Sequence, residues 1–372
     1  MEETSTVLAQ ELSNLPREII FEILLRLPVK SLSKFRSVSK SWLSLLSSPL
    51  FNKTHVNFSL NNPKMSDYRL AVVASVSKLG RICNIYNIGF GKDSFFNVVK
   101  HGNPAKYLSL SAKILGSCNG LICLTSDKFT LMLFNPCTGN FNVFPDSMLK
   151  DNSGGCYVRY GFGYDVSNED YKVVKIFSFP KTEGRYENMV KVYSLKAKSW
   201  SIIEGFNSGN INGKLGVFVN GALHWEACYS YCSSDSWAIV TLDLAEMKYG
   251  KIALPSYEDE GIYWTLGVSR GYLVACCNYE PKRADIWVMK EYGVEKSWTK
   301  LVTISLPLDR RDYVSPLFVT ENGDEVLLQF GAELTRYNSR NASFKRLDDF
   351  MSGDFRQVQV ITYLETLASP HI

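Results

Sequence analysis

Two patterns of apolar and polar residues divide the chain at about residue 52. Before it, apolar residues recur at helical spacing between prolines, whereas from about Tyr68 onward short alternating runs are separated by turn signals. The first pattern predicts a helical module over residues 12–52. The second predicts an all-β domain over residues 68–367, with a linker over residues 53–67 between them.

Prolines set the predicted bounds of three helices in the module. The first begins at Pro16 and ends before Pro28, the second covers Ser31 to Phe35, and the third covers Ser39 to Leu46 and is stopped by Pro49. Proline suits the first turn of a helix because its missing N–H would have no partner there, and it ends a helix that it follows.

The first of these helices is apolar nearly all round. Ile19, Ile23 and Leu27 form one stripe, and Phe21 and Leu25 lie on the far side. A module of about forty residues cannot bury all of this surface by itself. The surplus therefore predicts a partner. The alternative is that the helix packs against the downstream domain.

The module contains a specific series of short motifs. It contains Leu15-Pro16, then Leu27-Pro28, then Val38-Ser39-Lys40-Ser41-Trp42. The segment resembles an F-box, which implies docking onto a Skp-family adaptor and, through it, onto a cullin-based ubiquitin ligase. The division between residues that contact the adaptor and residues that hold the module together is left open. The apolar positions that match, and that are candidates for adaptor binding, are Leu15, Pro16, Ile20, Ile23, Leu24, Leu27, Pro28, Leu32, Val38 and Trp42.

Two independent markers repeat in the β domain with a period near 50 residues. Aromatic strands that follow a polar turn are 59, 49, 49 and 46 residues apart, at Phe141, Trp200, Tyr249, Trp298 and Phe344. Tight turns between apolar runs are 49, 52, 50 and 52 residues apart, at Asn119-Gly120, Asn168, Asn220-Gly221, Arg270-Gly271 and Asn322-Gly323. Asn-Gly favours hairpins because both residues tolerate positive φ.

This period predicts the fold class. Four short strands with their turns fill about 50 residues, the size of a kelch-type blade, so we expect a β-propeller of about six four-stranded blades. One run near the C-terminus, Gln357 to Leu364, lacks a successor, and three early runs, Arg69 to Val73, Ile82 to Ile88 and Phe95 to Val99, lack an inner strand. The C-terminal strand is therefore expected to close the last blade, which removes exposed sheet edges.

Several motifs of the β domain carry a second resemblance. They are Gly116-Ser117-Cys118-Asn119-Gly120-Leu121-Ile122-Cys123, Asn135-Pro136-x-Thr138, Gly161-Phe162-Gly163-Tyr164-Asp165 and Asn220-Gly221-Ala222-Leu223-His224-Trp225. They are similar to the F-box-associated domain of plant F-box proteins. The resemblance implies a kelch-like protein-interaction domain.

Strand alternation predicts where a protein target binds. The hairpin and polar turns share one face of the propeller, and the longer connections lie on the other. Long loops on a rigid scaffold carry recognition, and Tyr, Trp and Arg dominate binding hot spots. For any single residue, an ordinary solvated loop position is the alternative. The candidates are Tyr157, Tyr186, Tyr229, Tyr231, Trp237, Tyr257, Tyr263, Tyr279, Arg283, Arg310, Arg311 and Tyr313.

Composition narrows the environment and the partners. A net charge of +4 over 372 residues gives no basic stripe, so we expect no nucleic-acid partner. Residues 1–16 lack the pattern of a secretory signal, and no apolar run approaches the ~20 residues of a membrane span. The nine cysteines are scattered and odd in number, which indicates buried free thiols in a reducing compartment, the cytoplasm or nucleus.

Catalytic chemistry finds little support. His224, Cys228 and Cys232, with Asp235, have a spacing that zinc accepts, but a packed core histidine is the preferred interpretation. The chain has no phosphate loop and no nucleophile elbow, and it has four histidines. We therefore expect no catalytic residue, no cofactor and no metal.

The sequence thus predicts a non-catalytic subunit of a Skp–cullin–F-box ubiquitin ligase. It would dock the adaptor through the F-box and bind a protein target through the β domain for ubiquitination and proteasomal degradation. The alternative is an F-box protein that binds the adaptor without delivering a substrate. A third class is a propeller enzyme with an incidental helical leader.

Overall fold

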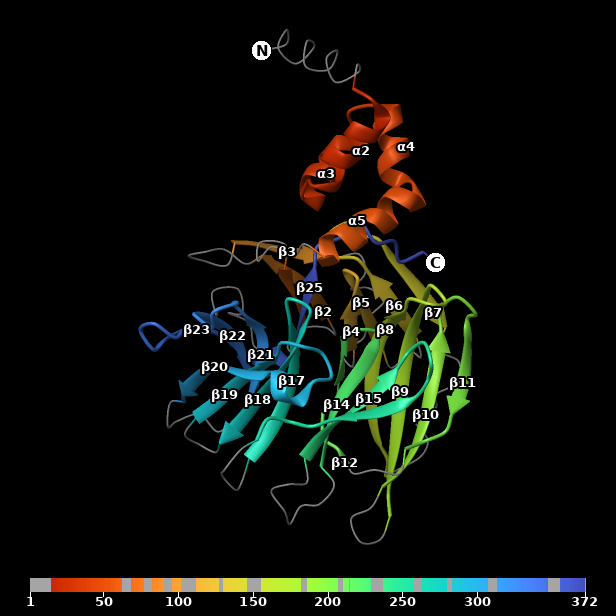
Figure 1. Ribbon diagram of the computed structural model, residues 1–372. Helices are drawn as coiled ribbons and strands as arrows, with labels where there is room; N and C mark the ends of the chain where they lie inside the picture. The colour runs from red at the N-terminus through yellow and green to blue at the C-terminus, as the bar shows by residue number, and fades with distance from the viewer. Residues whose placement is uncertain are drawn as a thin grey trace.

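The computed structural model describes residues 15–61, 68–76, 82–89, 96–101, 112–126, 130–145, 155–181, 186–206, 210–213, 215–228, 237–256, 262–279, 283–306, 313–346 and 355–371. Helices gather at one end, and the strands form the remainder of the molecule (Figure 1).

The helices of the N-terminal module follow the predicted order. They are α2 (Arg17–Leu25), α3 (Val29–Phe35), α4 (Lys40–Ser47) and α5 (Pro49–Asn61). Pro16 and Pro28 occupy the positions just before α2 and α3, and the Ser39 hydroxyl accepts a hydrogen bond of 3.2 Å from the Trp42 amide at the start of α4. The three predicted helices are confirmed, with the second beginning at Val29 instead of Ser31.

The third helix ends before Pro49, as predicted, but Pro49 also begins a further helix, α5, that the sequence analysis did not predict. Ser48 ends α4 in an extended conformation (φ −69°, ψ 140°), and its hydroxyl accepts a 3.2 Å hydrogen bond from the Phe51 amide. Proline is well suited to the first turn that follows such a cap. Residues 53–61 of the expected linker are consequently helical.

The described strands of the β domain form five sheets, four of them antiparallel and four-stranded. In spatial order the first sheet is β25 (Phe355–Leu364), β1 (Tyr68–Val76), β2 (Ile82–Gly89) and β3 (Phe96–His101), and the second is β4 (Lys113–Cys118), β5 (Leu121–Ser126), β6 (Thr130–Phe134) and β7 (Phe141–Pro145). Two others are β17 (Ile262–Ser269), β18 (Tyr272–Tyr279), β19 (Arg283–Met289) and β20 (Trp298–Ser305), and β21 (Val314–Val319), β22 (Glu325–Phe330), β23 (Glu333–Asn338) and β24 (Ser343–Arg346). A short 3₁₀-helix, η5 (Glu295–Ser297), precedes β20.

The nine-stranded sheet consists of two meanders joined along their first strands. One is β8 (Tyr157–Asp165), β9 (Asp170–Pro180), β10 (Tyr186–Ser194) and β11 (Ser199–Ile203), and the other is β12 (Asn210–Ile211), β13 (Leu215–Val219), β14 (Ala222–Cys228), β15 (Trp237–Asp243) and β16 (Tyr249–Ile252). A short parallel pairing aligns Gly216 of β13 with Gly161 of β8. A Cβ on Gly216 would lie 2.4 Å from the ring of Trp225 in β14, so the packing of this ring beside the β8–β13 pairing requires glycine.

Both repeat markers occupy equivalent places in successive meanders. The five predicted tight turns join β4 to β5, β8 to β9, β13 to β14, β17 to β18 and β21 to β22. Asn119 (φ 52°) and Gly120 (φ 84°) show the paired positive φ angles of a two-residue hairpin turn. The aromatic residues after the polar turns all fall in the outermost strands, at Phe141 in β7, Trp200 in β11, Tyr249 in β16, Trp298 in β20 and Phe344 in β24.

The C-terminal strand pairs with the N-terminal strands, as the phase of the repeat predicts. β25 lies antiparallel to β1 from Tyr68 opposite Leu364 to Val76 opposite Phe355. The first strands of the meanders contact one another in the order β25, β4, β8, β13, β17 and β21, and β21 contacts β25. The β domain is therefore propeller-like and is closed by pairing residues that are far apart in sequence.

After β25 the chain crosses the end of the neighbouring sheet. The fully buried Asn135 side chain donates hydrogen bonds to the carbonyl oxygens of Thr366 (3.0 Å) and Ala368 (2.8 Å) and accepts one from the Cys137 amide (2.9 Å). The Thr366 hydroxyl donates to the Asn119 carbonyl oxygen at 2.7 Å. These bonds fix residues 365–371, which we call the C-terminal segment, against the hairpin and polar turns.

Asn135→Ala is expected to destabilise the β domain. It removes both donors and the acceptor and leaves buried carbonyl and amide groups without partners, which costs about 2–4 kcal/mol. Urea unfolding measures the loss. Asn142→Ala is the matched control, because Asn142 donates a single 3.4 Å bond to the Pro370 carbonyl oxygen from a half-buried position, and its loss is expected to cost about 1 kcal/mol or less. Equal effects of the two variants would contradict this role of Asn135.

Candidate functional site

The helical module buries part of its predicted adaptor-binding set. Leu24 (1% exposed) and Leu32 (0% exposed) lie inside the module with Leu25, Val29 and Leu46. Neither side chain reaches the surface, so Leu24 and Leu32 belong to the core of the module, and their contact with an adaptor stays a prediction. Sequence alone does not separate the two roles, because the helix is apolar on every side.

The remaining predicted residues form a partly exposed apolar surface on the module. Ile20, Leu27 and Trp42 are half-buried, whereas Leu15, Pro16, Ile23, Pro28 and Val38 are exposed. Other exposed apolar residues accompany them, namely Ile19, Leu43 and Leu50. Ile19 was identifiable from the sequence, since it lies one turn before Ile23 in the same stripe.

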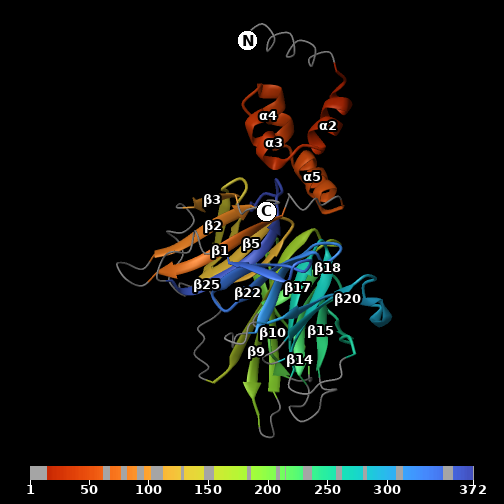
Figure 2. The same cartoon turned by 90° about the vertical axis from the view of Figure 1, so that its left-hand side faces the viewer.

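Helix α5 connects the module to the β domain (Figures 1 and 2). Val56 is buried in a core cluster of the β domain with Tyr171 and Leu195, and Lys53 forms an ion pair with Glu169 in the β8–β9 turn. Leu367 of the C-terminal segment is buried in the core cluster of the helical module. The helix that packs on the β domain is thus α5, while α2 keeps apolar residues exposed.

Three predicted partner-binding residues come together at the opposite end of the β domain. Trp237 begins β15, Tyr263 lies near the start of β17 and Tyr313 precedes β21. The rings of Trp237 and Tyr263 meet edge to face at 5.6 Å (80°), and those of Tyr263 and Tyr313 stack at 4.2 Å (19°). Half-exposed rings from three successive meanders form a continuous aromatic strip.

The other described candidates form two separate pairs on the same end. The Arg283 guanidinium lies over the Tyr279 ring at 4.2 Å, and Tyr157 lies 6.2 Å from Tyr186. Burial raises the pKa of Tyr279, so its hydroxyl stays protonated. The residues that lie outside the described part of the chain are Tyr229, Tyr231, Tyr257, Arg310 and Arg311.

Buried charges lie beneath the Tyr157 pair and were not anticipated. The Arg159 guanidinium lies 5.2 Å from the Tyr157 ring, and Arg159 is 7% exposed. Glu226 in β14 is 5% exposed, and its Oε2 atom has no hydrogen-bond partner. Burial raises the pKa of Glu226 to about 7, against a smaller opposing effect from the charge of Arg159. No sequence signal marks these residues, because charged residues in strands are normally exposed.

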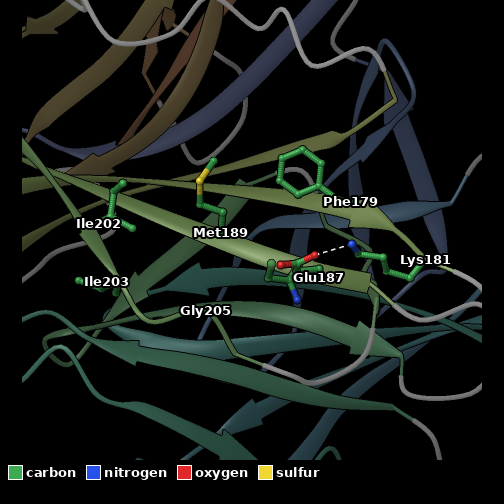
Figure 3. Close-up of a pocket in the computed structure, with 8 residues that line it drawn as sticks. Phe179, Lys181, Glu187, Met189, Ile202, Ile203 and Gly205 are labelled. Carbon is green, nitrogen blue, oxygen red and sulfur yellow. Dashed lines mark ion pairs between the residues drawn. The ribbon is translucent and has the colours of Figure 1, made fainter.

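A groove of about 530 Å³ lies at the outer edge of the β8–β11 meander (Figure 3). Phe179, Met189 and Ile202 supply apolar side chains, and Lys181 and Glu187 form a 2.6 Å ion pair at one end. Tyr186, a predicted partner-binding residue, is next to Glu187 in β10. No local pattern in the sequence predicts this groove, because its lining comes from three strands.

His224 is a packed core histidine, as the sequence analysis preferred. It is fully buried, its Nδ1 atom lies 3.1 Å from the Val217 carbonyl oxygen, and its Nε2 atom lies 2.9 Å from the Tyr292 hydroxyl. Burial lowers its pKa to about 4. Cys228 is also buried, and Cys232 and Asp235 lie outside the described residues. Within the described ranges, no three His, Cys, Asp or Glu residues are grouped closely enough to hold a metal ion.

Seven cysteines in the described ranges are free thiols, and five of them, including the adjacent Cys276 and Cys277, are buried. In the same ranges, no helix has the length and apolar character that crossing a membrane demands.

A helical module with exposed apolar residues joined to a propeller-like domain is the arrangement expected of an F-box protein, and comparisons with known proteins agree. Residues 12–54 match the F-box domain, and residues 38–368 match the F-box associated beta propeller domain. The chain therefore belongs to the family of F-box proteins with an F-box-associated β-propeller domain. F-box domains generally bind Skp-family adaptors in ubiquitin ligase complexes.

Relatives from Arabidopsis thaliana extend over nearly the whole chain. An F-box/kelch-repeat protein is 34% identical, with 96% of each chain covered, and the F-box protein CPR1 is 30% identical, with 86% of this chain and 80% of the relative covered. Among solved structures, the oligogalacturonate lyase of Vibrio parahaemolyticus aligns with a TM-score of 0.41 and 10% identity over 74% of this chain and 79% of the lyase. That structural likeness is too low to carry an argument.

Glu226→Gln is expected to change the pH dependence of stability. The folded pKa of Glu226 is raised from 4.5 to about 7, so its contribution to stability is present below pH 4.5 and is lost as the pH rises through 7. The loss is on the order of 3 kcal/mol. Urea unfolding at pH 5 and pH 8 should show wild type losing more stability than Glu226→Gln. Glu246→Gln, an exposed control, should behave as wild type; a Glu226→Gln profile parallel to wild type would contradict the assignment.

Proposed function

We propose that the protein is the substrate-recognition subunit of a Skp–cullin–F-box ubiquitin ligase. The observation that carries the proposal is the placement of two surfaces at opposite ends of the molecule. The helical module lies beyond α5, on the side of the hairpin and polar turns (Figure 1), and carries the exposed apolar surface. The aromatic strip lies at the starts of β15, β17 and β21, the strand ends away from those turns. An adaptor and a protein target can therefore be bound together without competing for one surface.

The proposal extends to the finer architecture and the setting. The first strands of the meanders contact one another around a ring in the order β25, β4, β8, β13, β17 and β21. This order supports a propeller of six blades, in which the nine-stranded sheet counts as two blades. The protein itself is non-catalytic, and other subunits, including the cullin, bring ubiquitin to the target for proteasomal degradation. Buried free thiols support a reducing location, the cytoplasm or nucleus.

Charging the exposed surface of the helical module should abolish adaptor binding. Ile23 (45% exposed) and Val38 (60% exposed) tolerate Ile23→Lys and Val38→Lys in the free protein, whereas each lysine would be desolvated at an apolar interface. The double variant is expected to bind a purified Skp-family adaptor at least about 100-fold more weakly. Titration calorimetry measures the affinity. Val294→Lys, a similarly exposed apolar position in the β19–β20 connection, is the control that should retain wild-type binding. Undiminished binding by the double variant would overturn the assigned surface.

Delivery of a substrate is tested separately in cells. Proteins captured by the Ile23→Lys, Val38→Lys variant through the β domain should accumulate and show a longer half-life than with wild type, because they are bound without being ubiquitinated. An unchanged half-life for every captured protein would favour the alternative, an F-box protein that binds the adaptor without delivering a substrate.

A further inference from the structure

The outermost strand of each meander is a sheet edge, and most of these edges carry a feature that discourages pairing with another chain. Charged residues lie within four of them, with Lys100 in β3, Lys251 in β16, Lys300 in β20, and Lys345 and Arg346 in β24. β7 ends at Pro145, and its Asn142 is bonded to the C-terminal segment. Lysine and proline on edge strands are the usual means by which proteins prevent edge-to-edge pairing.

β11 has none of these features. Its sequence, Ser199 to Ile203, contains no charged residue and no proline, and Ile202 is 68% exposed. Within the described residues β11 pairs only with β10, from Ser199 opposite Ser194 to Ile203 opposite Val190. Backbone groups alternate in direction along an antiparallel strand, so about half of its N–H and C=O groups point away from β10.

The strand is nevertheless firmly held on its inner side. The Trp200 ring packs on Tyr193 at 5.1 Å and lies beneath the Lys175 ammonium at 5.0 Å, and the Ser201 hydroxyl donates a 3.3 Å bond to the Val192 carbonyl oxygen. The edge is therefore presented in an extended conformation before any partner arrives. Pre-formed backbone geometry lowers the entropic cost of binding.

The groove described above begins where β11 ends. β10 extends past β11, because Tyr186 to Met189 pair with β9 alone. After β11 the chain passes close to β10 at Gly205. A side chain is excluded there, because an added Cβ would lie 1.8 Å from the Asn188 carbonyl oxygen. Met189 and Phe179 fall on the same side of the sheet as Ile202, since Lys191 is opposite Ile202 and side chains alternate. An apolar side chain projecting from a strand paired with β11 would enter this groove (Figure 3).

We propose that the β11 edge binds an extended, uncharged segment of the protein that the chain recruits, which adds to the sheet as a further strand. This inference rests on the proposed function. The free edge dictates an extended backbone as the ligand, and Phe179, Met189 and Ile202 dictate an apolar side chain at one alternate position. An uncharged segment is favoured, because Lys181 and Glu187 already form an ion pair with each other at the end of the groove and offer a charged segment no unpaired partner.

Selection from a random heptapeptide library displayed on phage tests the proposal. The full chain is the bait, and Ile202→Lys is the counter-bait, since a lysine at this position reproduces the protection of the other edges. Ile202 is mostly exposed, so the variant should fold; its unfolding temperature checks this. Enriched peptides are expected to alternate apolar residues with a period of two, to lack proline, and to bind Ile202→Lys at least about tenfold more weakly by fluorescence anisotropy.

Two further measurements separate the outcomes. Ser343→Lys, on the already charged edge β24, should bind the peptides as wild type does, and a bound peptide should slow amide hydrogen exchange within residues 199–203. The proposal would be overturned by peptides that bind Ile202→Lys as tightly as wild type, or by a proline-rich consensus among the enriched peptides. So would a wild-type dimer in sedimentation that Ile202→Lys abolishes, because the edge would then belong to a second copy. Adaptor affinity is measured independently. If the adaptor binds but no peptides of this kind are found, the proposal for the β11 edge fails while the proposed function stands.

Discussion

Residues 355–368 join the helical module to the β domain and close the β domain. β25 supplies the strand that β1 requires on its inner side, and Asn135 then fixes the chain beyond it by two hydrogen bonds to backbone carbonyl oxygens. Leu367 is buried in the core cluster of the helical module. One short stretch thus closes the β domain and contributes to the interior of the docking module, so neither part is complete without it.

This arrangement governs how the two candidate surfaces relate. α5 rests on the hairpin and polar turns through the buried Val56 and the exposed Lys53–Glu169 ion pair. The aromatic strip of Trp237, Tyr263 and Tyr313 lies at the other end of strands that run the depth of the domain. If the strip binds a target, as proposed, that target would be separated from the docking module by the depth of the β domain.

Local features were predictable from the sequence, and features that depend on packing were not. Asn119-Gly120 and its counterparts fix their turns by backbone preference alone, so the period and the closing strand followed. Pro49 marked the end of α4, but the helix that begins there depends on the Ser48 cap and on the surface that α5 covers, which the sequence does not reveal. The burial of Leu24 and Glu226 and the groove beside Ile202 arise from neighbours that are distant in sequence, and no local pattern encodes them.

The position of β25 also has a consequence during synthesis. Because a chain emerges from the ribosome from its N-terminus, β1, β2 and β3 wait without their inner partner until almost all of the other strands have been made. α5 likewise lacks the segment that contains Leu367 until the same moment. A prematurely terminated chain would present both an open sheet and an incompletely packed docking module. Closure of the β domain and completion of the core of the module therefore both depend on the last residues to be synthesised.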